Sequence, residues 1–118
     1  MPLALGGVSQ EVIPILRVAS VERAVAWYEQ LGFTKEWEHR FEPHLPAFAS
    51  IMRGRAHLYL SEHDGDGGPD TLVYIRHSDL DALAELLDAE ITEVPWGREL
   101  KICDPDGNRL RISDPIDD

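Results

Sequence analysis

The five histidines are the first residues to test for chemistry, because histidine is the commonest side-chain ligand of transition metals. His57 and His63 fall on one face of an extended segment, but six residues of strand separate them by roughly 20 Å, too far to share an ion. His39, His57 and Glu62 could converge only through tertiary folding. The chain also has no Gly-x-Ser-x-Gly motif and no phosphate-binding loop. No catalytic constellation is visible in the sequence.

An aromatic row suggests a different chemistry. From Phe33 to Phe41 the residues alternate in type, which predicts a strand. One predicted face carries Lys35, Trp37, His39 and Phe41, and the other carries Thr34, Glu36, Glu38 and Arg40. A face this rich in rings suits stacking on a flat organic ligand better than it suits water.

The elements that position these residues are predicted by an internal repeat. Residues 13–22 read IPILRVASVE and return about 59 positions later, at residues 72–81, as LVYIRHSDLD. Each copy is an apolar strand followed by an amphipathic helix, with Ser20 and Ser78 as the expected N-caps and Asp81 as a weak capping-box partner. Gly32 is expected to end the first helix. A repeated unit predicts two similar sheets with a cleft between them.

The remaining strands complete two βαβββ modules. The predicted strands cover residues 13–18, 33–41, 48–53 and 56–61 in the first module and 71–76, 91–94, 98–103 and 108–113 in the second. A Gly- and Asp-rich linker occupies residues 63–70, and a turn at 104–107 joins the last two strands. We therefore expect an α+β protein, one domain over residues 1–118, with modules at about 12–62 and 70–114.

The composition excludes several classes of function. The formal net charge is -11, with 11 Lys and Arg against 22 Asp and Glu, which argues against nucleic acid and anionic membranes as partners. No apolar run approaches the roughly 18 residues of a membrane span, and the N-terminus has no basic segment typical of a signal peptide. A cytoplasmic protein is expected. The single cysteine, Cys103, is expected to be a small core thiol.

Four motifs together carry a family resemblance. They are the strand Ile13–Val18, the helix end Trp27–Phe33, the segment Pro95–Glu99 and the turn Asp104–Asn108. Over about residues 12–113 the chain resembles the glyoxalase / bleomycin-resistance / extradiol dioxygenase (vicinal oxygen chelate) superfamily, and within it the antibiotic-binding bleomycin-resistance branch. The resemblance implies paired βαβββ modules, which agrees with the repeat.

The resemblance also locates the metal site of the superfamily's enzymes. Its four ligand positions fall here on Ile13, Tyr59, Leu72 and Arg111. Ile and Leu have no donor atom, Arg is permanently cationic, and one Tyr cannot complete a ligand set. We therefore expect no metal and no other cofactor.

The same resemblance places Ile13 and Leu72 in the ligand cleft, and strand alternation then adds their neighbours. Leu58, Leu60, Leu110 and Ile112 are left to pack under the helices. The predicted ligand-binding residues are Arg17, Trp37, His39, Phe41, His57, Tyr59, Tyr74, Arg76, Trp96, Arg109 and Arg111.

Together these features predict a protein that confers antibiotic resistance by sequestering a large planar aromatic drug, of bleomycin type or of polycyclic or enediyne type, without transforming it. The resemblance implies an intertwined homodimer, with an N-terminal arm crossing at Pro14 and ligand grooves between subunits. Trp37, Phe41 and Trp96 are the candidates for stacking, or they cover the dimer interface instead. Arg109 and Arg111 either face the ligand or pair with acidic residues.

The alternative function is a small lyase or isomerase of the same superfamily. It would use an unrecognised metal site or a general base among His39, His57 and Glu99. Metal analysis of the purified protein separates this alternative from sequestration.

Overall fold

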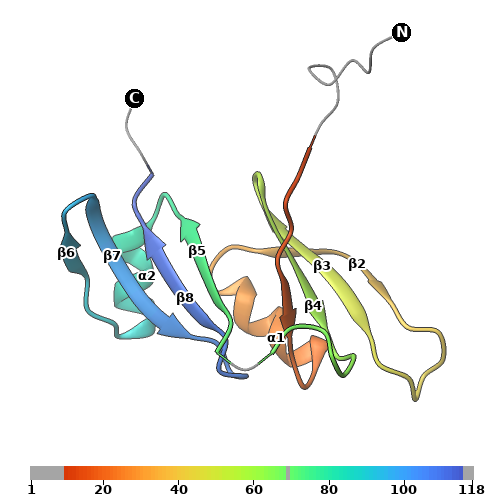
Figure 1. Cartoon of the computed structure of the whole chain (residues 1–118). Helices are drawn as coiled ribbons and strands as arrows, with labels where there is room; N and C mark the ends of the chain where they lie inside the picture. The colour runs from red at the N-terminus through yellow and green to blue at the C-terminus, as the bar shows by residue number, and fades with distance from the viewer. Residues whose placement is uncertain (1–9, 69, 116–118) are drawn as a thin grey trace, which may run out of the picture.

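The structure is a computed structural model that describes residues 10–68 and 70–115. The described chain forms two βαβββ modules, as predicted, and the fold is α+β (Figure 1). The first module comprises β1 (Ile15–Arg17), α1 (Val21–Glu29), β2 (Thr34–His39), β3 (Phe48–Arg53) and β4 (Ala56–Ser61). The second comprises β5 (Leu72–Arg76), α2 (Leu80–Leu87), β6 (Thr92–Val94), β7 (Gly97–Cys103) and β8 (Arg109–Ser113).

Each module has a four-stranded mixed sheet, with strand orders β1-β4-β3-β2 and β5-β8-β7-β6. The first strand of each module pairs in parallel with its last strand, and the other pairs are antiparallel. Both helices lie on the same side of the sheets (Figure 1). No helix within the described residues has the length and hydrophobicity needed to cross a membrane.

The first helix follows the predicted signals closely. The hydroxyl of Ser20 accepts a hydrogen bond from the backbone N–H of Arg23, which satisfies one of the free donors at the helix N-terminus. Val21, Ala24 and Tyr28 are buried against the sheet. Gly32 has a φ of 90°, a left-handed conformation that favours glycine and that turns the chain out of the helix.

The predicted cap of the second helix is wrong. Asp79, not Ser78, is the N-cap residue, and its side chain makes no capping hydrogen bond. The hydroxyl of Ser78 instead accepts a hydrogen bond from Arg53 of the first module. Asp81 does not form a capping box, because its carboxylate is paired with Arg98 at 2.9 Å. Tertiary partners have replaced the local caps here.

The predicted faces of the second strand also need correction. Lys35 is opposite Ile51 and Trp37 is opposite Ser50, so Glu36 is an extra residue that forms a β-bulge. A bulge moves the residues on its two sides to opposite faces of the strand. Lys35 therefore lies on the helix side with Ile51, whereas Trp37 lies on the other face with Ser50.

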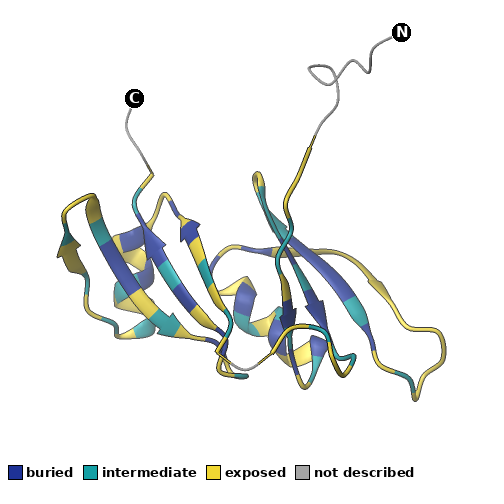
Figure 2. Cartoon of the chain, viewed as in Figure 1, coloured by how far each residue is buried: buried dark blue, intermediate teal, exposed yellow. Residues whose placement is uncertain are grey.

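The core lies between the sheets and the helices, where the sequence places it. Leu58, Leu60, Leu110 and Ile112 are all buried. Buried positions alternate with more exposed ones along most of β8 and in the middle of β4, whereas every residue of β2 is exposed (Figure 2). Cys103, in contrast, is exposed, so the expectation of a core thiol is wrong. Its strand position pairs it with Arg109, away from the helices.

The β7–β8 turn of the second module locks against the first module. The hydroxyl of Tyr28 donates to the carboxylate of Asp104 at 2.8 Å in a buried contact. Asp106 accepts from the backbone N–H of Ala19 at 2.9 Å, just before α1. The side-chain amide of Asn108 donates to the carbonyl of Arg17 at 3.0 Å.

A reciprocal contact runs from the first module to the second. Arg53, at the end of β3, donates to Ser78 and to the carboxylate of Asp79, each at 3.2 Å. The buried ring of His77 lies 2.7 Å from the carbonyl of Leu31 through its Nε2 atom. Each module thus contacts the residues just before the other module's helix. We therefore expect the two modules to unfold together.

Candidate functional site

We define the open face as the side of both sheets that faces away from α1 and α2. Strand alternation brings a continuous set of side chains to this face. In the first sheet, one cross-strand row runs from Ile15 through Tyr59 and Ser50 to Trp37. In the second sheet, the corresponding row contains Tyr74, Arg111 and Lys101.

An aromatic cluster occupies the open face of the first sheet. The rings of Trp37 and Phe48 are stacked, with centroids 6.0 Å apart and planes 16° apart. Tyr59 completes the cluster, with its centroid 5.4 Å from that of Trp37 and 5.1 Å from that of Phe48. Trp37 remains 44% exposed. The cluster is therefore an apolar platform that is packed internally but open on its outer side.

A carboxylate organises the open face of the second sheet. Glu99 is only 1% exposed, and three side chains converge on it. Tyr74 donates through its hydroxyl at 2.7 Å, and Trp96 donates through its indole N–H at 2.8 Å. Arg111 donates from its guanidinium at 2.7 Å. The arginine of this group is thus paired with an acidic residue, which was one of the two options the sequence left open.

The pKa of Glu99 is lowered to about 2. The hydrogen bond from Tyr74 is the main cause, and those from Arg111 and Trp96 add to it against the opposing effect of desolvation. A carboxylate with this pKa has little affinity for a proton near neutral pH. Glu99 is therefore poorly suited to the general-base role that the enzyme alternative gives it.

Three other predicted arginines, near the aromatic cluster and Glu99, each contact a side chain or a backbone carbonyl. The guanidinium of Arg76 lies 5.7 Å from the Tyr74 ring centroid, in a cation–π arrangement. Arg17 is paired with Asp64 at 2.8 Å. Arg109 donates to the backbone carbonyl of Asp70 at 2.7 Å.

The remaining predicted residues lie at the margins of the open face. His39 and Phe41 meet edge to face, with centroids 4.5 Å apart, where β2 leads into its hairpin loop. His57 Nδ1 lies 3.0 Å from the carboxylate of Glu11. Of the eleven predicted residues, the structure brings Trp37 and Tyr59 together in one sheet, and Tyr74, Arg76, Trp96 and Arg111 in the other.

The donor set does not fit a metal of the superfamily's enzymes. Among the four corresponding positions, Arg111 is committed to Glu99, Ile13 and Leu72 have no donor atom, and Tyr59 packs in the aromatic cluster. Elsewhere in the described residues, no group of three His, Cys, Asp or Glu side chains is arranged to hold an ion.

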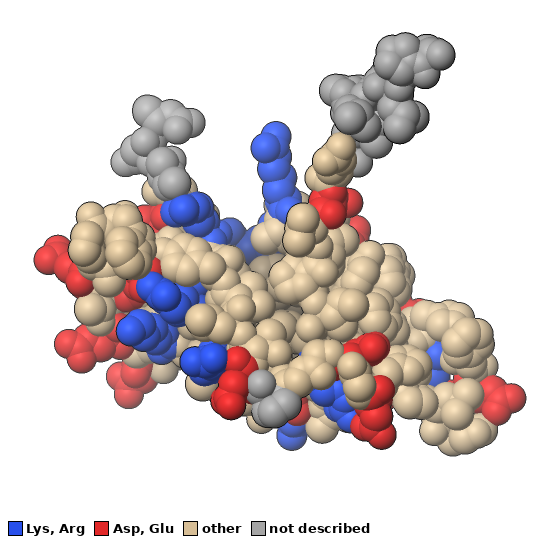
Figure 3. Space-filling model, in the orientation of Figure 1, with Lys and Arg blue, Asp and Glu red and all other residues tan. Residues whose placement is uncertain are grey.

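Two residues of the open face were missed by sequence reasoning. Phe48 begins a predicted strand, but its place opposite His39 depends on the hairpin register. Lys101 shares a face with Glu99 and Cys103 by simple alternation, which is the signal that could have revealed it. Figure 3 shows Lys and Arg side chains gathered over the second sheet, whereas the first sheet is largely free of charge on this side.

Comparisons with known proteins give a consistent family and fold. A family model described as "Glyoxalase superfamily protein" matches residues 4–118. No curated protein matches the sequence. An antibiotic-binding protein from Streptomyces sp. CB03234 is similar in structure, with a TM-score of 0.74 and 21% identity over 93% of this chain and 98% of that chain.

Two bleomycin-related structures are also similar. A bleomycin resistance determinant encoded on the transposon Tn5 has a TM-score of 0.70 and 20% identity, over 90% of this chain and 98% of that chain. A bleomycin-binding protein from bleomycin-producing Streptomyces verticillus, complexed with copper(II)-bleomycin, has a TM-score of 0.65 and 25% identity, over 92% of this chain and 98% of that chain.

Proposed function

Because the chain belongs to the glyoxalase superfamily and presents an open aromatic platform, we propose that it binds a planar aromatic antibiotic non-covalently and sequesters it. The observation that carries this proposal is the Trp37–Phe48–Tyr59 cluster on the open face. Aromatic residues left partly exposed on a sheet lose the stabilisation that burial would give them. A flat ligand stacked on Trp37 would restore it, at about 0.5–1.5 kcal/mol per ring pair beyond burial.

The structural neighbours support the antibiotic as the class of ligand. One is an antibiotic-binding protein and another was determined with bound copper(II)-bleomycin. Sequestration needs only affinity, and an aromatic platform supplies it without a nucleophile or a general base.

A homodimer is part of the proposal. The chain is a flat slab with extents of 47 × 45 × 23 Å and a radius of gyration of 16.0 Å, against about 13.5 Å for a compact domain of this length. Phe41 and Trp96 are 76% and 64% exposed, an arrangement that a partner subunit would cover. The arm that precedes Pro14 lies, up to residue 9, outside the described residues. Light scattering should give about twice the chain mass of 13.3 kDa.

The test is a thermal-shift screen of polycyclic and bleomycin-type antibiotics, followed by calorimetric titration of each hit. A ligand at 100 times its dissociation constant adds about 2.7 kcal/mol to the free energy of unfolding. Trp37→Ala should weaken binding about thirtyfold or more, the usual effect of losing a buried aromatic anchor. Trp96→Ala should weaken binding as well, because Trp96 presents a 64% exposed ring beside Glu99 on the open face.

Trp27→Phe is the matched control. Trp27 packs edge to face on Tyr28, on the helix side of the molecule, and its change should leave affinity unaltered. Mass spectrometry after prolonged incubation should return the drug intact. Turnover beyond one altered molecule per site would refute sequestration and favour the lyase or isomerase alternative.

A further inference from the structure

The basic side chains of this protein differ in whether a carboxylate lies close to them. Most of the 11 basic residues have a carboxylate within 4.0 Å among the described residues. The exceptions are Arg55, Arg76, Lys101 and Arg109. Three of these exceptions, all but Arg55, lie on the open face of the second sheet. In a chain with 22 acidic residues, a face with three cations that have no carboxylate partner among the described residues needs a specific explanation.

Two of these cations line one cavity. A cavity of about 420 Å³ opens over β7 and β8, and Leu72, Lys101, Cys103, Arg109 and Arg111 are among its lining residues. This volume lies within the range of small-molecule sites. Its lining combines positive charge with the apolar side chain of Leu72, which is 48% exposed.

The strand register places two positive charges side by side in this cavity. Lys101 is directly opposite Arg111 in the β7–β8 ladder, and like charges at opposite positions destabilise a sheet. Glu99 neutralises Arg111 from one side, but within the described residues no carboxylate approaches Lys101 or Arg109. An anion in the cavity would remove the repulsion and accept charge-assisted hydrogen bonds from both.

We propose that this cavity holds the acidic group of the ligand, and that the ligand class is therefore a planar aromatic acid: a polycyclic compound with a carboxylate, a sulfonate or an ionised phenol. The inference rests on the proposed function, because it assigns the charged end of the molecule whose rings stack on the open face. It also distinguishes this protein's ligand from cationic drugs of the bleomycin type. Leu72 would contact the ring that bears the acidic group.

The experiment compares two matched probes, anthraquinone-2-sulfonate and the uncharged 2-(hydroxymethyl)anthraquinone. Their ring systems are the same, so the difference between their dissociation constants isolates the acidic group. The sulfonate should bind about tenfold more tightly at low salt. Lys101→Gln and Arg109→Gln should each reduce that preference severalfold. Raising the ionic strength should reduce it as well.

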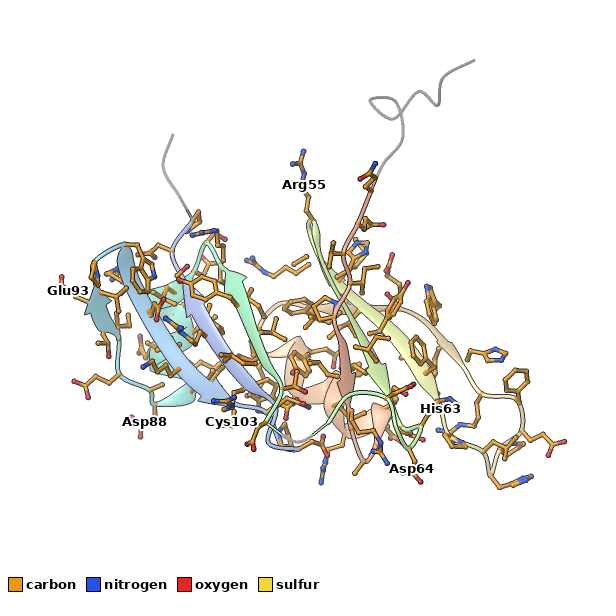
Figure 4. The ribbon with its side chains drawn as sticks, in the orientation of Figure 1. Arg55, His63, Asp64, Asp88, Glu93 and Cys103 are labelled. Carbon is orange, nitrogen blue, oxygen red and sulfur yellow. The ribbon has the colours of Figure 1, made fainter. Side chains whose placement is uncertain are left out.

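Arg55→Gln is the control, since Arg55 lies outside both the cavity and the open face of the second sheet, and no carboxylate lies within 4.0 Å of it among the described residues. Figure 4 places Arg55 at the β3–β4 turn and Cys103 at the far end of β7. This variant changes the net charge by the same amount as the others, so an unchanged preference for the sulfonate would separate a local site from a general field effect.

Cys103 provides an independent readout, because it is the only cysteine of the chain and lines the cavity. Bound sulfonate should slow alkylation of Cys103 by iodoacetamide, and Lys101→Gln should abolish this protection. Equal binding of the two probes, unaffected by both variants, would overturn the inference and leave the proposed function intact. If neither probe bound, the acidic-group site would be refuted, and the antibiotic screen described above would decide the proposed function separately.

Discussion

The two modules have the same backbone plan but opposite surface chemistry. The cross-strand pair Ile15–Tyr59 in the first sheet corresponds to Tyr74–Arg111 in the second. One row further along, Phe48 is opposite Ser61, and Glu99 is opposite Ser113. Phe48 and Glu99 thus occupy equivalent positions in the two sheets. Phe48 contacts neighbouring aromatic rings, whereas Glu99 accepts hydrogen bonds from neighbouring side chains.

This difference indicates that the repeat constrains the residue types on the buried face of each sheet but not those on the open face. The helix side needs apolar side chains at the same register in both sheets, since both must cover a helix. The open face has no such requirement, so one half can specialise in stacking and the other in charge. A ligand with flat rings and an acidic group would use both halves.

The substitutions with the largest expected effect test whether the buried faces of the two sheets contribute equally to stability. Leu58 and Leu110 occupy corresponding positions on β4 and β8 and are 3% and 1% exposed. Leu58→Ala and Leu110→Ala should each lower the free energy of unfolding by about 2–5 kcal/mol, through lost apolar burial and the cavity created. Urea unfolding followed by circular dichroism should show one transition in both variants, because the modules interlock. A biphasic curve would contradict this coupling.

Two substitutions with smaller expected effects test which inter-module contact contributes more to the free energy of unfolding. Tyr28→Phe removes the buried hydrogen bond to Asp104 and should lower the free energy of unfolding by about 1–2 kcal/mol. Arg53→Met removes the reciprocal contact to Asp79, whose carboxylate is 63% exposed, and should lower it by less than about 1 kcal/mol. Denaturant midpoints of the two variants, measured side by side, show which substitution destabilises the protein more. A larger decrease in Arg53→Met than in Tyr28→Phe would contradict the prediction that the buried contact contributes more.

A pH-dependent measurement tests the contrast between Phe48 and Glu99. The pKa of Glu99 is about 2 in the folded protein against an ordinary value of 4.5. Its ionised form therefore stabilises the fold above about pH 4.5, and this contribution is lost as the pH falls toward 2. The difference in melting temperature between the natural protein and Glu99→Gln should narrow over that range.

Phe48→Leu is the control for this titration. It alters the equivalent position of the first sheet without removing an ionisable group, so its effect on melting temperature should not change with pH in the same window. A parallel narrowing in Phe48→Leu would mean that the acid effect comes from groups other than Glu99.

Much of the fold was predictable because the signals are local or periodic. The cap at Ser20, the alternation that buries Leu60 and Ile112, and the repeat itself depend only on neighbours along the chain. The cap predicted at Ser78 failed because Arg53, distant in sequence, binds that hydroxyl. The shared face predicted for Lys35 and Trp37 failed because a bulge at Glu36 has no signal in a pattern of period two, whereas Trp37 and His39 do share a face as predicted.

The sequence by itself determined the two βαβββ modules, their buried leucines and the absence of donor atoms at Ile13 and Leu72, because residue type and spacing decide these properties. Only the tertiary structure decided which side chains meet on the open face. Phe48 joins Trp37 through a hairpin register, and Glu99 gathers Tyr74 and Arg111 across three strands. Such contacts depend on how strands align in space, and the energies that align them are summed over the whole sheet.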